Sequence, residues 1–184
     1  MSDLSTQPDQ TRLIGELDLR LPLTGLYDAP DPRAFAPLVA PRAGAGRGPC
    51  VFDHFRRRQH GETLHLMPGA FGCGDCGRAF FGIQTRSRDG FIDFLWKDEG
   101  LRASRALTAT WVDDAPTYHS AYGHILIGPL KPKLAGHLKS VTFWVNPDQL
   151  SVLQHGAYHH HRWGEPEPVT VPFGSACMDG TISP

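Results

Sequence analysis

The side chains most capable of chemistry in this sequence are its four cysteines. Cys73 and Cys76 are separated by Gly-Asp, a spacing that lets two thiolates reach one metal centre. A glycine follows each of them, so the backbone can adopt positive φ and turn its N–H groups toward the sulfurs. A four-thiolate site would also need Cys50 and Cys177 from distant parts of the chain. We therefore expect an iron–sulfur cluster or a zinc ion with these ligands: Cys50, Cys73, Cys76 and Cys177.

The same cysteine pair allows a different chemistry. A CxxC that opens a helix after a strand is the redox motif of dithiol proteins. Here a strand-like stretch precedes the pair and an apolar stretch, residues 79–83, follows it. A thiol–disulfide oxidoreductase, with Cys73 attacking and Cys76 resolving, therefore stays open as an alternative. Considered singly, Cys50 and Cys177 are more often small buried hydrophobes. Whether the protein is an enzyme is left open.

Two histidines near the C-terminal end are candidates for additional metal ligands. His155 and His159 are four residues apart, so on a helix they share one face and could bind one ion. The alternative is a polar helix end, where cationic histidine is favoured by the helix dipole.

A third functional class is a binding module for a small ligand. Aromatic side chains could line its pocket, although such residues more often fill a core. The aromatic residues concerned are Phe80, Phe81, Phe91, Phe94, Trp96 and Trp144.

Length and composition limit these possibilities. The 184 residues suit one domain, and 40% hydrophobic with 20% charged residues indicates a globular core. A net charge of -1 gives no field for nucleic acid, and no stretch approaches the roughly 20 apolar residues of a membrane span. Residues 1–10 are polar and lack the pattern of a secretory signal, which predicts a cytoplasmic protein with reduced thiols. A redox partner protein is the expected partner; the oligomeric state is not determined by the sequence.

The elements that must position these side chains are a mixture of strands and helices. Strands are predicted at residues 23–27, 63–67, 124–130 and 140–145. Helices are predicted at residues 10–19 and 101–108 and at Pro147–Tyr158, where Asn146 is a good N-cap. Residues 29–49 are rich in proline and glycine and predict a long loop, residues 1–10 are expected to be flexible, and residues 51–59 are ambiguous. Because strands and helices do not alternate regularly, we expect a single α+β domain with a mixed or antiparallel sheet and packed helices.

Several stretches, taken in order, resemble a known family. Cys50 is followed by three arginines and then Gly-Glu-Thr; residues 73–83 form a Cys-Gly turn ending in Phe-Phe-Gly-Ile; residues 128–130 read Gly-Pro-Leu. Asn146 opens Asn-Pro-Asp-Gln, and Ala-Cys ends at Cys177. This series is similar to the domain of unknown function 169 family. The resemblance implies a bacterial or archaeal soluble domain whose recurrent cysteines match Cys50, Cys73 or Cys76, and Cys177.

Overall fold

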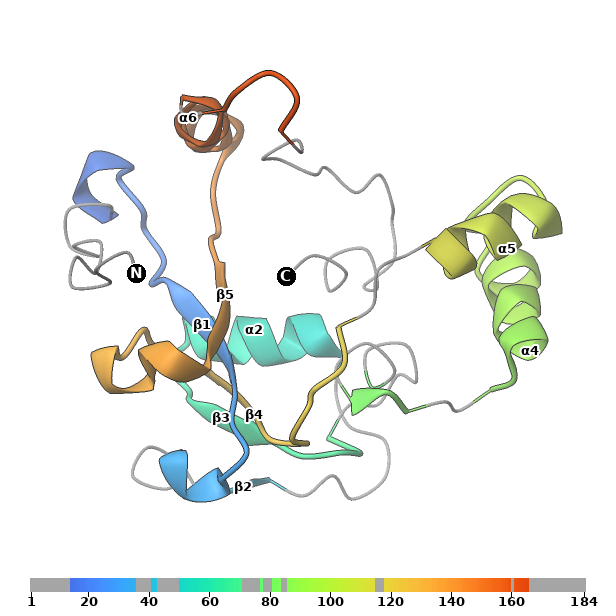
Figure 1. The fold of residues 1–184 in the computed structure, drawn as a ribbon, viewed down its shortest axis with the longest axis horizontal. Coiled ribbons are helices and arrows are strands. Elements are labelled where there is room, and N and C mark those ends of the chain that lie inside the picture. The colour runs from blue at the N-terminus through green and yellow to red at the C-terminus, as the bar shows by residue number, and fades with distance from the viewer. Residues whose placement is uncertain are drawn as a thin grey trace.

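The computed structural model describes residues 14–35, 41–42, 50–70, 77, 81–83, 86–114, 118–159 and 161–165. Strands and helices follow one another in mixed order around a single sheet (Figure 1). The strands are β1 (Thr24–Asp28), β2 (Pro41–Arg42), β3 (Leu64–Leu66), β4 (Ile125–Gly128) and β5 (Leu138–Thr142). The helical elements are η1 (Pro32–Ala34), α2 (Val51–Gln59), α4 (Arg88–Asp93), η2 (Phe94–Asp98), α5 (Arg105–Asp114), η3 (Pro132–His137) and α6 (Pro147–Tyr158). The α+β prediction is confirmed.

The sheet is mixed, with strand order β2-β3-β4-β1-β5. Neighbouring strands are antiparallel except β2 and β3, which run parallel. The short strand β2 begins with Pro41 at the edge of the sheet, where a missing N–H costs no ladder hydrogen bond. Both β2 and η1 lie within residues 29–49, so the described part of the expected long loop contains a 3-10 turn and an edge strand.

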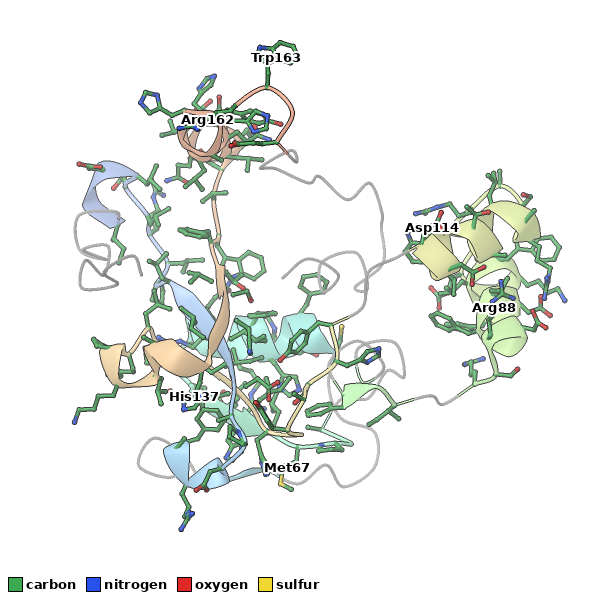
Figure 2. The ribbon with its side chains drawn as sticks, viewed as in Figure 1. Met67, Arg88, Asp114, His137, Arg162 and Trp163 are labelled. Atoms are coloured by element: carbon green, nitrogen blue, oxygen red, sulfur yellow. The ribbon has the colours of Figure 1, made fainter. Side chains whose placement is uncertain are left out.

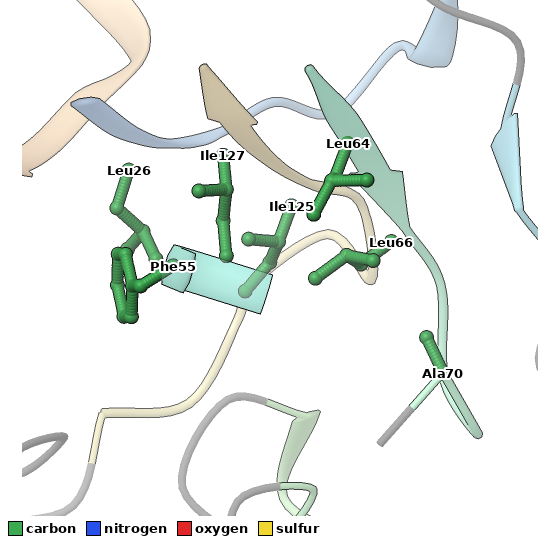
Figure 3. Close-up of a cluster of buried hydrophobic side chains, with 7 residues drawn as sticks. All are labelled: Leu26, Phe55, Leu64, Leu66, Ala70, Ile125 and Ile127. Carbon is green, nitrogen blue, oxygen red and sulfur yellow. The ribbon is translucent and has the colours of Figure 1, made fainter. Parts of the chain in front are cut away.

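One face of the sheet packs against α2. Because side chains alternate along a strand, Leu64 and Leu66 of β3 point to the same face as Ile125 and Ile127 of β4. Phe55 of α2 packs into this layer and is 7% exposed. Figure 3 shows the complete cluster, which we call the α2 cluster: Leu26, Phe55, Leu64, Leu66, Ala70, Ile125 and Ile127.

The opposite face carries the alternate residues of the same strands. Tyr27 and Leu126 face each other in register and pack with Phe35, which follows η1, and Leu134 of η3. His65, between the two leucines of β3, is fully buried on this face. Both faces of the sheet are therefore covered, and every residue of β1, β3 and β4 is buried.

Two further apolar clusters hold the outer elements. The alternate residues 141, 143 and 145 of β5 and the segment after it point to the same side. They pack with Leu153 of α6 and with three leucines near the N-terminus, Leu17, Leu19 and Leu23. The amide of Gln149 donates to the carbonyl oxygens of Leu17 (2.7 Å) and residue 18 (3.0 Å), which fastens α6 to this cluster. The α4–η2–α5 hairpin has its own core and stands away from the sheet in Figure 1.

The predicted helix at Pro147–Tyr158 is confirmed. Asn146 accepts from the Gln149 N–H at 2.9 Å while the Gln149 side chain accepts from the Asn146 N–H, a complete capping box. The helix expected at residues 101–108 instead begins at Arg105, because the Ser104 hydroxyl accepts from the Leu107 N–H and caps it there. Across the described residues, we find no helix with the length and apolarity needed to cross a bilayer.

Candidate functional site

Cys50 lies at the N-terminal end of α2. It occupies the N-cap position in an extended conformation, and its side chain makes no capping hydrogen bond. The thiol is free and half-buried. Its packing partner is the α2 cluster, against which Phe81 and Tyr118 also pack. The end of this cluster is thus covered by side chains from three separate parts of the chain.

Helix α2 has two chemically different faces. His54, Phe55 and Arg58 are buried toward the sheet. Phe52, Arg56 and Gln59, spaced four and three residues apart, form a stripe on the outer side. The pattern explains why α2 forms here although residues 51–59 were ambiguous in sequence: its apolar side is narrow and one of its inward positions carries an arginine.

A pocket of about 550 Å³ lies along the outer stripe of α2. Trp144 forms the wall of the pocket opposite α2. Side chains alternate along an extended segment, so Trp144 points to the opposite side from residues 143 and 145, which pack in the cluster with Leu17. Among the described residues, those lining the pocket are Cys50, Phe52, Asp53, Arg56, Gln59 and Trp144. A free thiol, two aromatic rings and an ion pair therefore share one concave surface.

Residues 81–83, which follow the CxxC in sequence, lie beside the loop that carries His119. Gly77 is buried, and its carbonyl oxygen accepts from the Ile83 N–H at 3.4 Å. At Gly82, where φ is +64°, an added side chain would lie 3.1 Å from Nδ1 of His119. Glycine is required there both for the backbone conformation and for this close approach. Residues 81–83 and the loop around His119 are therefore neighbours.

Asp28, at the end of β1, holds that loop in place. Its carboxylate is 1% exposed and accepts from the Tyr118 hydroxyl, from the Ser120 hydroxyl at 2.8 Å and from the Ala121 N–H at 3.0 Å. Burial, reinforced by the hydrogen bond to Asp28, raises the pKa of the Tyr118 phenol. The phenol therefore stays protonated and acts as a donor. Asp28 thereby positions Tyr118 against the cluster that also contacts Cys50.

A second polar arrangement lies on the opposite face of the sheet. Nε2 of His65 is 3.2 Å from Nδ1 of His124, and the Phe35 ring meets His65 edge-on with centroids 5.1 Å apart. Burial, and then the neighbouring His124, lower the pKa of His65. Its Nδ1 is buried and has no hydrogen-bond partner within the described part of the chain. The lowered pKa favours the neutral form of His65, whose Nε2 lies within hydrogen-bond distance of Nδ1 of His124.

The comparisons with known proteins give a family and nothing finer. A family model matches residues 37–184; it is the domain of unknown function 169, described as an uncharacterised ArCR. The chain belongs to this family. The pocket and all four cysteines fall inside the matched residues, whereas β1 and Asp28 precede them. No curated protein and no solved structure matches the chain.

The structure describes only some of the residues that the sequence proposed as ligands. Cys50 is placed as given above, while Cys73, Cys76 and Cys177 lie outside the described residues. His155 and His159 are both exposed, on α6 and at its C-cap. In the described ranges, no group of three or more His, Cys, Asp or Glu side chains could hold a metal ion. The four-thiolate set thus stays a prediction for this member of the domain of unknown function 169 family.

Sequence reasoning missed two features of the site. The first is Phe52, which lines the pocket together with Trp144. In the sequence, only its spacing from residues 56 and 59 indicates that its side chain points outward from the helix. Asp28 looks like an ordinary strand end, and its partners begin 90 residues further on. Neither residue stands in a recognisable motif.

Proposed function

We propose that this protein binds a thiolate-ligated metal centre, an iron–sulfur cluster or a zinc ion, and serves a redox or sensing role. Its ligands are Cys50, Cys73, Cys76 and Cys177. An iron–sulfur cluster would exchange electrons with a redox partner protein, whereas zinc would fasten the segments that carry the cysteines.

The environment of Cys50 is the observation that supports this proposal. A metal-binding thiol must be unoccupied by other bonds and shielded from bulk water, yet open enough for the metal to enter. Cys50 is free of a disulfide, half-buried and without a cap hydrogen bond, and it lines a pocket. A thiol that served only as packing would be enclosed by the core on all sides.

The neighbourhood of Cys50 includes the sequence next to the CxxC. Phe81, five residues after Cys76, packs against the same α2 cluster as Cys50. Gly77, which directly follows Cys76, is buried. Phe81 thus packs on the same interior as Cys50, which supports a centre shared by Cys50 and the CxxC.

The test is metal analysis of the full chain purified without oxygen. We expect stoichiometric iron with acid-labile sulfide and visible absorption, or stoichiometric zinc without colour. Cys50→Ser is the informative variant because serine is a better N-cap than cysteine, so α2 should keep its stability while the centre is lost. Asp53→Asn changes the same helical turn, leaves the thiol in place, and should retain the metal.

Two results would count against the centre. One is a protein that stays free of metal when purified anaerobically and after reconstitution with iron and sulfide or with zinc. The other is a Cys50→Ser protein that folds and keeps the full metal content. A metal-free protein in which Cys73 and Cys76 interconvert between dithiol and disulfide would support the thiol–disulfide chemistry instead.

A further inference from the structure

The pocket beside α2 has the size and walls of a small-molecule site. Its volume of about 550 Å³ is within the range of ligand pockets, and it is largely open to solvent. The outer stripe of α2 forms one wall and Trp144 forms the other. Phe52 is 42% exposed and Trp144 is 37% exposed, so a considerable part of both rings faces solvent.

The two pocket rings differ from two other tryptophans of the described chain, whose rings have cationic neighbours. Trp96 lies 5.7 Å from the Lys97 ammonium, and the Trp111 ring is covered by the Arg102 guanidinium at 4.6 Å. Neither Phe52 nor Trp144 has a ring or cation partner within the described residues. Their faces remain available for stacking inside one pocket.

The same pocket has a polar edge. Arg56 and Asp53 form an exposed ion pair at 2.9 Å, which leaves the edge without a large net charge. Gln59, one helical turn further along the stripe, is half-buried and offers an amide donor and acceptor. A neutral molecule with hydrogen-bonding atoms on its rim fits this edge better than a strongly charged one.

We propose that this pocket binds a small, neutral, planar heteroaromatic molecule, which stacks against Phe52 and Trp144 and hydrogen-bonds with Gln59. The free faces of two rings select a flat π-system, and the amide selects a ring bearing nitrogen or carbonyl groups over a hydrocarbon. The inference does not depend on a metal centre, because the thiol of Cys50 lines the pocket with or without a metal.

The experiment is calorimetric titration of the full chain with adenosine and riboflavin, and with ribose as the non-aromatic probe. We expect one aromatic probe to bind at one site per chain and to quench tryptophan emission, while ribose does not bind. Phe52→Ala and Trp144→Ala should each weaken binding about tenfold or more, since stacking on one aromatic side chain contributes about 1–3 kcal/mol. Gln59→Ala should weaken it less.

Trp163→Ala is the matched control, because Trp163 is fully exposed, projects beyond α6 (Figure 2) and is not among the residues that line the pocket. It should bind as the wild type does. If Trp144→Ala folds poorly, Trp144→Phe replaces it as the test variant. Because Trp144→Phe keeps an aromatic ring in the pocket, it should bind the probe more tightly than Trp144→Ala. Probe binding is measured on the chain as purified and again after metal removal by a chelator, and it should be the same in both, so a failed metal centre and a failed pocket are distinguishable. Absence of binding by both aromatic probes, or binding unaffected by Phe52→Ala and Trp144→Ala, overturns the proposal.

Discussion

Replacing Asp28 by alanine should destabilise the protein strongly, although Asp28 forms no ion pair with any residue that the structure describes. The carboxylate is 1% exposed and accepts from two hydroxyl groups and one backbone N–H. A hydrogen bond to a charged group contributes about 1.5–3 kcal/mol, and buried donors left without an acceptor add to the cost. Ser120 retains its own bond from the Gly123 N–H, and such bonds are not additive, so we expect a total loss of about 3–5 kcal/mol.

Two variants calibrate this value. Asp28→Asn preserves the size but presents an NH₂ group to donors, so it should fall between alanine and the wild type. Ser120→Ala removes the hydroxyl that donates to the carboxylate and accepts from the Gly123 N–H, so it should lower the free energy of unfolding by about 1–2 kcal/mol, less than Asp28→Ala does. The assay is urea unfolding followed by tryptophan emission, with unchanged m-values required for the comparison. If the free energy of unfolding of Asp28→Ala lies within about 0.5 kcal/mol of the wild-type value, the buried hydrogen bonds of Asp28 do not stabilise the fold as proposed.

Three further predictions concern other parts of the fold. The pKa of His65 in the folded chain lies below its ordinary value of 6.5, so between these two values the unfolded chain binds a proton that the folded chain does not. The free energy of unfolding should therefore fall as the pH drops below 6.5, by up to about 1.4 kcal/mol per pH unit. In urea titrations between pH 8 and 5, His65→Gln should make this pH dependence weaker. Phe55→Ala should cost about 3–5 kcal/mol through a core cavity, whereas Phe52→Ala on the exposed side of the same helix should cost little; equal losses in urea unfolding would contradict the assigned faces. Arg105→Ala should lower the melting temperature only at low salt, because the ion pairs of Arg105 with α4 are exposed to solvent and screened by salt. An equal decrease of the melting temperature in molar salt would contradict this account of the ion pairs.

The parts of the fold predicted correctly are those with local signals. Residues 125–127 form a continuous apolar run that ends at Gly128-Pro129, and β4 spans this run. The pair Asn146-Pro147 is sufficient to place the start of α6. By contrast, pairing in β5 ends at Thr142 although alternation continues through residues 143–145, because only hydrogen bonding to β1 defines the strand. Alternation alone cannot tell a paired strand from an extended segment.

The site required information that no local pattern contains. A stripe at positions 52, 56 and 59 predicts an outward face of a helix, but Trp144, which completes the pocket, lies about 90 residues away in the chain. Asp28 likewise gains its role only when β1 and β4 pair and bring the loop at residues 118–121 beside it. The cysteines were found by residue type, which identifies chemistry without placing it.

The most direct test of the central claim is X-ray absorption at the metal edge of the anaerobically purified full chain. We expect a shell of sulfur neighbours at about 2.3 Å from iron or zinc, with fewer sulfurs, or no bound metal, when Cys50 is replaced by serine. A shell made only of oxygen and nitrogen would contradict the thiolate centre.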